Sequence, residues 1–264
     1  MNLELRGKTA VVTGSTAGIG LAIALALAEE GAAVAVNGRT AARVAAAEAA
    51  IRRKVKDAEL RGVAADLGTA AGAAEFVRQV PQTDILVNNL GIYAAKPFLE
   101  ISDSEWTEIF EVNVMSGVRL ARHYLPGMLR RNWGRVIFIS SESAQHIPPE
   151  MVHYGMTKTA QLAIARGLAE GVAGTRITVN SVLAGPTASE GVTAFVADMA
   201  KQRGLSTAEI ESDFFKTVRP TSLLKRFETP EEIAAVVAFV ASTRSIAING
   251  AAVRAEGGVV RSIL

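Results

Sequence analysis

Cysteine is absent from the 264-residue sequence, and histidine occurs only 3 times. Without cysteine the chain has neither disulfide bonds nor thiolate metal sites, which is typical of proteins from a reducing compartment. His123, His146 and His153 are scattered along the chain, and their spacing does not match a metal-ligand set. We therefore expect no metal site.

Long apolar runs and an excess of one charge are also missing. The longest apolar run, residues 21–28, is far shorter than the ~20 residues that cross a membrane. The first ten residues, MNLELRGKTA, contain no apolar stretch of the kind found in a secretory signal. Lys+Arg 28 against Asp+Glu 26 leaves a formal net charge of +2, with no basic cluster to bind nucleic acid. We expect a cytoplasmic protein that binds neither membranes nor nucleic acids.

Short apolar runs alternate with helical stretches along the chain. Residues 10–12, 32–36 and 84–87 are typical of buried strands, and alanine-rich or amphipathic stretches follow them. Seven such alternations predict an α/β fold, a doubly wound, seven-stranded parallel sheet with helices on both faces in three layers. No linker divides the chain, so residues 1–264 form one domain. Residues 186–222 break the alternation with two amphipathic stretches.

A glycine turn joins the first predicted strand to the first predicted helix. Gly14, Gly18 and Gly20 are spaced G-x3-G-x-G, and the helix behind them is almost wholly apolar. Free backbone N–H groups and the positive end of the helix dipole meet at such a turn and bind anions. Pyrophosphate is the anion that strand–glycine turn–helix units usually hold.

A tyrosine and a lysine four residues apart open a later helix. Tyr154 and Lys158 therefore share one helix face. A tyrosine ionises near pH 10, and a nearby ammonium favours the phenolate and lowers its pKa. Such a tyrosine exchanges a proton with an alcohol oxygen near neutral pH.

Together these motifs resemble the short-chain dehydrogenase/reductase family, over nearly the whole chain. The shared motifs, in order, are TGSTAGIG (13–20), Asp66–Leu67, NNLG (88–91), Asn113 in EVNV, Ser141 in ISSES, YGMTK (154–158) and NSVLAGPTAS (180–189). The resemblance implies a Rossmann-type fold and a homotetramer. It also implies hydride transfer between a nicotinamide cofactor and a small-molecule carbonyl or secondary alcohol, with a substrate lid at about residues 186–222.

By resemblance, four residues form the catalytic set. Tyr154 is the general acid/base, and Ser141 hydrogen-bonds the substrate oxygen. Lys158 lowers the tyrosine pKa and holds the nicotinamide ribose. Asn113 holds a water in a proton relay that reaches Lys158.

The resemblance also implies the cofactor contacts. Asp66 and Leu67 contact adenine, and Asn89 and Gly91 contact the adenosine end. The expected cofactor-binding residues are Gly14, Ser15, Thr16, Gly18, Ile19, Gly20, Asn37, Arg39, Asp66, Leu67, Asn89, Gly91, Tyr154, Lys158, Gly185, Thr187 and Ser189.

The end of the second strand indicates which nicotinamide cofactor binds. Sites for NAD usually place an acid there, about 20 residues past the glycine turn, to bind the ribose 2′-hydroxyl. Here that position is Gly38, no acid occurs between Gly31 and Ala47, and Arg39 follows. A guanidinium suits a 2′-phosphate, so NADP(H) is favoured over NAD(H).

Some motif positions are ambiguous or depart from the family. On chemistry alone Ser140 and Ser143 compete with Ser141, and only the thirteen-residue spacing to the tyrosine selects among them. Leu90 replaces the usual alanine of NNLG, which adds bulk near the cofactor. Ala184 replaces a usual proline, which puts the position of the following segment in doubt.

Three functions remain open. The first is an NADPH-dependent carbonyl reductase, whose best-known branch reduces 3-oxoacyl groups on acyl carrier protein. Asn132 and Thr175 stand where that branch has its carrier-binding arginines, so a carrier partner is left open. The second is an NAD-dependent alcohol, polyol or sugar dehydrogenase. The third is a non-catalytic cofactor-binding regulator, against which the intact catalytic set argues.

Overall fold

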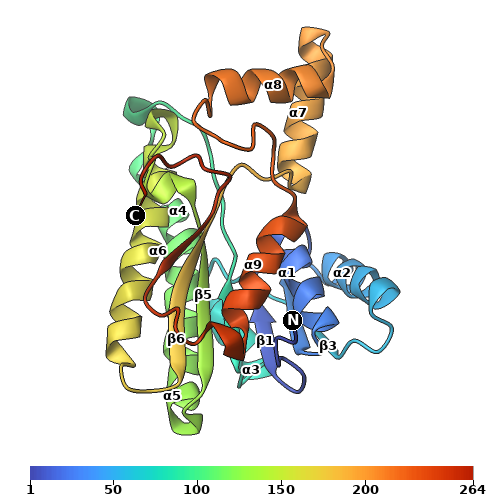
Figure 1. The fold of residues 1–264 in the computed structure, drawn as a ribbon, viewed down its shortest axis with the longest axis vertical. Coiled ribbons are helices and arrows are strands. Elements are labelled where there is room, and N and C mark those ends of the chain that lie inside the picture. The colour runs from blue at the N-terminus through green and yellow to red at the C-terminus, as the bar shows by residue number, and fades with distance from the viewer. Residues whose placement is uncertain (264) are drawn as a thin grey trace.

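A parallel β-sheet forms the centre of the molecule (Figure 1). The computed structural model describes residues 1–263, with the side chain of Phe195 outside the described part. Over that range the sheet has seven strands in the order β3-β2-β1-β4-β5-β6-β7, and every neighbouring pair is parallel. The strands are β1 Thr9–Val12, β2 Ala33–Gly38, β3 Leu60–Ala64, β4 Ile85–Asn88, β5 Gly134–Ser141, β6 Ile177–Ala184 and β7 Ala252–Ala255. The predicted doubly wound α/β fold is confirmed.

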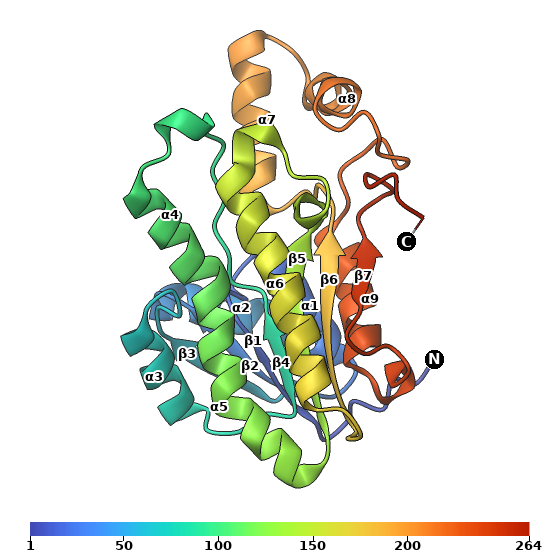
Figure 2. The same cartoon turned by 90° about the vertical axis from the view of Figure 1, so that its left-hand side faces the viewer.

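Helices cover both faces of the sheet (Figure 2). On one face lie α1 Gly18–Glu29, α2 Ala41–Lys54 and α9 Pro230–Ala241. On the other lie α3 Ala70–Gln79, α5 Ser116–Arg131 and α6 Val152–Gly171. Because successive strand side chains point to opposite faces, Val12 joins the first hydrophobic cluster and Val11 the second. None of the described helices is long and apolar enough to cross a membrane.

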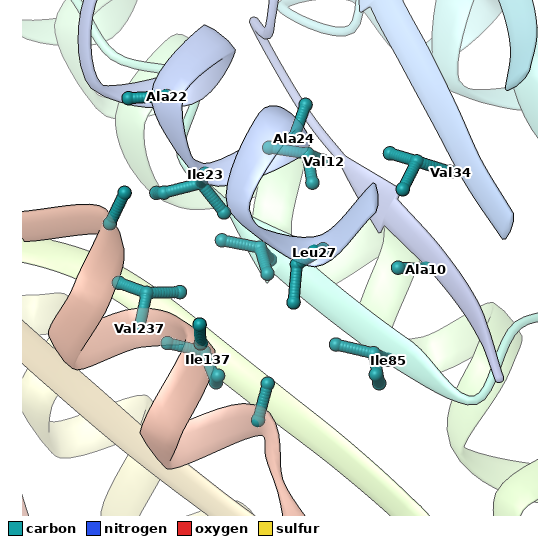
Figure 3. Packing of buried hydrophobic residues seen from close by; sticks show 14 of the residues in the cluster. Ala10, Val12, Ala22, Ile23, Ala24, Leu27, Val34, Ile85, Ile137 and Val237 are labelled. Atoms are coloured by element: carbon teal, nitrogen blue, oxygen red, sulfur yellow. The ribbon is translucent and has the colours of Figure 1, made fainter. Parts of the chain in front are cut away.

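The apolar helix behind the glycine turn is buried on several sides (Figure 3). Ile23 and Leu27 of α1 are both 0% exposed. They pack in one cluster with Ile85 of β4, Ile137 of β5 and Val237 of α9. Truncating such a side chain to alanine costs about 2–5 kcal/mol, so this packing holds the start of α1 firmly at the sheet.

The helical segment between β4 and β5 is interrupted in the middle. It consists of α4 Asp103–Phe110, a π turn Glu111–Met115 and then α5. Its N-cap is Ser102, which forms a capping box with Glu105. The wide π turn carries Asn113, and such turns are frequent at functional sites.

Two helices project beyond the carboxyl ends of the strands, where the lid was predicted (Figures 1 and 2). They are α7 Glu190–Arg203 and α8 Thr207–Thr217, and they pack against each other. Phe214 and Phe215 of α8 stack with Phe227, at ring-centroid distances of 5.0 and 5.2 Å. These aromatic contacts attach α8 to the chain that follows it.

Candidate active site

The glycine turn has the backbone geometry of an anion site. Gly14 and Gly18 have φ values of +59° and +53°, a region that favours glycine. Helix α1 begins there, and its N-cap Ala17 makes no side-chain hydrogen bond to the first N–H groups. A side chain at Gly20 would place its Cβ 2.5 Å from the carbonyl oxygen of Gly14. The first turn of α1 thus presents uncapped N–H groups to an anion, as the pyrophosphate prediction requires.

Two of the predicted cofactor-binding residues, Asn37 and Ser15, form hydrogen bonds within the protein that shape this turn. The Asn37 side chain is 2% exposed: its Oδ1 accepts from the Gly14 N–H at 3.1 Å, and its Nδ2 donates to the Val63 and Ala65 carbonyls at 3.3 and 3.1 Å. Ser15 is also buried, and its hydroxyl accepts from the Asn37 N–H at 2.9 Å. A side-chain contact from Asn37 or Ser15 to a cofactor therefore does not fit this geometry. Both residues position the turn.

The NNLG segment braces the same turn from β4. Asn89 Nδ2 donates to the carbonyls of Thr13 and Gly14 at 2.9 and 3.1 Å. Leu90, the departure from the family motif, is half-buried, and its side chain would lie 3.4 Å from a Cβ placed on Gly14. The larger side chain of Leu90 thus packs beside the glycine turn. Asn89 supports the same turn through its hydrogen bonds to Thr13 and Gly14.

The predicted adenosine contacts differ in exposure. Asp66 is exposed, and its Oδ1 accepts from the Gly68 N–H at 3.1 Å, which leaves its other oxygen uncommitted. Leu67 is only 1% exposed and belongs to the second hydrophobic cluster. Thr16 and Ile19 are partly exposed at the glycine turn.

The end of β2 has no room for an acid. A Cβ on Gly38 would lie 2.4 Å from Thr16 Cγ2, which is closer than side-chain carbons approach. Arg39 follows and is exposed, and it makes no hydrogen bond or ion pair to any described residue. A free guanidinium therefore stands where a ribose-binding carboxylate is expected in an NAD site.

The tyrosine and lysine lie on the first turns of α6, beside the end of β5. Lys158 Nζ donates to the Ile139 carbonyl at 2.9 Å and lies 5.5 Å from the centre of the Tyr154 ring. The Ser141 hydroxyl interacts with the tyrosine. Ser140 instead donates to the Lys158 carbonyl at 2.9 Å, which commits it to holding α6. This arrangement favours Ser141 among the candidate serines.

Asn113 connects the π turn to the loop after β4. Its Oδ1 accepts from the Ile92 N–H at 2.7 Å, and its backbone carbonyl accepts from Gln161 Nε2 at 2.7 Å. A Cβ on Gly91 would lie 3.4 Å from Asn113 Oδ1 and 3.5 Å from Lys158 Nζ. Asn113 and Lys158 therefore both lie near Gly91, and the water relay between them stays a prediction.

The ionisation of the tyrosine differs from expectation. Burial, and secondly the Glu142 carboxylate, raise the pKa of Tyr154 above its usual value, while Ser141 and Arg219 act weakly against this. Burial also lowers the pKa of Lys158 to about 8. The prediction that Lys158 lowers the Tyr154 pKa is not met by this geometry, because the ammonium faces a backbone carbonyl and burial dominates.

Comparison with known proteins decides the family. Residues 8–200 match the model of the family described as short chain dehydrogenase. The chain belongs to the short-chain dehydrogenase/reductase family.

Relatives match this short-chain dehydrogenase/reductase over its full length. The oxidoreductase YvaG of Bacillus subtilis (strain 168), described as uncharacterized, is 51% identical, with 100% of both chains covered. The 3-oxoacyl-(acyl-carrier-protein) reductase FabG of Aquifex aeolicus (strain VF5) is 32% identical, with 98% of this chain and 100% of that chain covered. L-sorbose reductase from Gluconobacter frateurii, solved in complex with NADPH and L-sorbose, is 31% identical with a TM-score of 0.94, again covering 100% of both chains. This chain is accordingly an enzyme acting on CH–OH groups or carbonyls with NAD(P).

The segment after β6 closes over the glycine turn. The Gly185 N–H donates to Glu228 Oε2 at 3.1 Å, and the buried Thr187 hydroxyl donates to the Gly185 carbonyl at 2.9 Å. Ser189 caps α7, and its Cβ would lie 3.3 Å from a Cβ on Gly18. The structure thus brings the predicted cofactor-binding residues after β6 next to the glycine turn, despite the departure at Ala184.

Two charged residues near Ser141, Glu142 and Arg219, were not predicted as site residues from the sequence. Glu142 and Arg219 form an ion pair at 2.9 Å and are only 4% and 8% exposed. Glu142 also accepts a hydrogen bond from Ser141. The position of Glu142 beside the serine was a usable signal, but Arg219 lies 77 residues away, and nothing local marks it.

Glu228 makes part of the stability of this enzyme pH-dependent. Burial is the main cause that raises the pKa of Glu228 to about 7, whereas an unfolded glutamate ionises near 4.3. Between these values the unfolded chain has lost a proton that the folded chain keeps, so stability falls as the pH rises to 7. Glu228→Gln stays neutral and still accepts from Gly185. We expect its advantage over the wild type in urea unfolding to grow by about 2–3 kcal/mol between pH 5 and pH 8.

The control for this experiment is Glu231→Gln, which removes an exposed carboxylate from the start of α9. Its difference from the wild type is expected to stay nearly constant over the same range. If the stability difference between Glu228→Gln and the wild type is also constant over this pH range, the raised pKa of Glu228 is contradicted.

Proposed function

We propose that the enzyme uses NADP(H) to interconvert a carbonyl compound and its secondary alcohol, with reduction as the working direction. The observation that carries the cofactor choice is the end of β2, where a side chain at Gly38 would require Thr16 to move and where Arg39 has no partner among the described residues. A 2′-phosphate offers Arg39 a charged partner, and the absent acid removes a repulsive charge. The NADPH complex of the L-sorbose reductase supports the same choice.

The residues around Tyr154 support the chemistry. When bound, a nicotinamide cofactor supplies hydride transfer. The phenol of Tyr154 is protonated at neutral pH and lies beside Ser141, so it is available to donate its proton to a carbonyl oxygen. Lys158 and Asn113 converge beside it at Gly91 and support the proposed path for replacing the proton.

A substrate panel tests this proposal. NADPH consumption is measured with ketoses such as L-sorbose, with 3-oxoacyl thioesters and with simple diketones, each repeated with NADH. We expect turnover with NADPH for at least one class of carbonyl. Turnover only with NAD⁺ and alcohols, polyols or sugars supports the dehydrogenase alternative instead. Cofactor binding without turnover of any panel member supports a regulator.

We also propose a homotetramer that uses the outer faces of α5 and α6. A groove of about 340 Å³ runs between these helices, and apolar residues form most of it: Val118, Ala121, Leu125, Pro126, Leu129, Ile164 and Leu168. Leu129 is 42% exposed, as is Leu205 in the loop between α7 and α8. By light scattering, Leu129→Glu is expected to lower the mass from four chains, while Leu205→Glu leaves it unchanged. A monomeric wild type, or an unchanged Leu129→Glu, contradicts this arrangement.

A further inference from the structure

A pair of opposite charges is buried against the proposed catalytic serine. Arg219 Nε donates to Glu142 Oε1 at 2.9 Å, and Arg219 Nη1 donates to the Val218 carbonyl at 3.1 Å. The second carboxylate oxygen, Glu142 Oε2, accepts the hydrogen of the Ser141 hydroxyl. Buried charges are costly unless they are paired and hydrogen-bonded, and here both carboxylate oxygens have partners. The pair is thus a built feature that fixes the surroundings of Ser141.

The hydrogen bonds of Ser141 within the protein leave its hydroxyl one free position, which is an acceptor. A serine hydroxyl has one hydrogen to donate and two lone pairs that accept. The hydrogen goes to Glu142, and one lone pair accepts from the Ser143 N–H at 3.1 Å. One lone pair remains. Ser141 can therefore accept from the Tyr154 hydroxyl or from a substrate alcohol, but it donates to a carbonyl oxygen only after leaving Glu142.

The two charges come from distant parts of the chain. Glu142 directly follows β5, whereas Arg219 follows α8, the second helix of the lid. The position of Arg219 therefore depends on how the lid is attached to the body, and Arg219 in turn holds the carboxylate that holds Ser141.

We propose that Glu142 is a positioning residue that takes the Ser141 hydrogen and so limits its donation toward Tyr154, and that Arg219 holds Glu142 in this role. This inference rests on the proposed function of Ser141 and Tyr154.

Glu142 and Ser141 act on the ionisation of Tyr154 in opposite directions. The negative charge of Glu142 disfavours the phenolate and raises the pKa of Tyr154, whereas a hydrogen bond from Ser141 lowers it. A serine whose hydrogen is held by Glu142 donates less to the phenolate, so Glu142 also weakens this opposing effect. The titratable or charged groups around this tyrosine are Tyr93, Glu142, Lys158 and Arg219.

Glu142→Gln tests the inference directly, because it keeps the size of the side chain, removes its charge and offers Ser141 an N–H donor. Ionisation of Tyr154 is followed by ultraviolet difference absorbance, with the corresponding Tyr154→Phe protein subtracted. We expect ionisation to begin about one pH unit lower than in the wild type. The acid limb of the pH profile for NADP⁺-dependent alcohol oxidation is expected to move by a similar amount. Circular dichroism verifies that the protein stays folded over the range.

Two further variants keep the result decisive. Glu150→Gln removes a carboxylate from the segment between Ser141 and Tyr154 without touching either residue, and it is expected to leave both readouts unchanged. Glu142→Gln/Arg219→Met removes both buried charges, which guards against misfolding caused by an unpaired arginine. It is expected to shift Tyr154 in the same direction by less, because the loss of Arg219 acts in the opposite sense.

An unchanged Tyr154 titration in Glu142→Gln, or an equal shift in Glu150→Gln, overturns the inference. The absorbance readout needs no substrate. A wild type that turns over no panel member therefore counts against the proposed function, while the titration still decides the role of Glu142.

Discussion

Tyr154→Phe is expected to lower kcat/KM about a thousandfold while NADPH still binds. The phenol lies beside Ser141, and phenylalanine removes its hydroxyl without changing the ring. Steady-state turnover of the best panel substrate measures the loss, and a fluorescence titration measures NADPH binding. A lysine neighbour with a pKa near 8 is not a substitute, because its ammonium faces the Ile139 carbonyl.

Tyr93→Phe is the matched control for this experiment. The Tyr93 ring centre lies 6.3 Å from that of Tyr154, and the residue is 57% exposed. Removing its hydroxyl is expected to change kcat/KM by less than about tenfold. A Tyr154→Phe enzyme that keeps most of its activity excludes the tyrosine as the general acid.

Arg39→Asp is expected to weaken NADPH affinity by about 10- to 100-fold and to leave NADH affinity unchanged or improved. A charge-assisted hydrogen bond to a phosphate is worth about 1.5–3 kcal/mol, and the introduced carboxylate repels the same phosphate. The dissociation constants of the two cofactors, measured in the same buffer, give the ratio directly. Arg39 has no partner among the described residues, so the folded state loses nothing by the change.

The control is Arg53→Asp, which makes the same charge change at an exposed position near the end of α2. It is expected to affect both cofactors little and equally, because exposed charges beyond about 10 Å are largely screened by salt. Equal losses of NADPH affinity in the two variants contradict a specific role for Arg39.

Much of the fold was predictable because buried parallel strands and amphipathic helices have different sequence periods. The strands predicted at residues 10–12, 32–36 and 84–87 match β1, β2 and β4 to within two residues. The π turn at Glu111–Met115 was not predicted, since its sequence continues a helical pattern. The extra residue of the π turn changes the backbone hydrogen bonds and leaves the apolar pattern of the sequence unchanged.

The site was predictable as a set of positions but not as a set of contacts. Residues at strand ends converge in any parallel sheet, so Ser141 and Tyr154 were correctly placed at one edge. Whether a polar side chain faces a ligand or the backbone depends on packing, and Asn37 faces the backbone. The pKa of Tyr154 likewise depends on burial and on Glu142 and Arg219, which no local motif connects.

A fluorescence titration of the wild-type protein with NADPH and, in parallel, with NADH measures cofactor binding at the glycine turn, at Arg39 and at the segment after β6 together. We expect saturable binding of both cofactors, with NADPH bound at least about tenfold more tightly. Equal affinities or a preference for NADH contradict the role of Arg39, and the binding of neither contradicts the cofactor site itself.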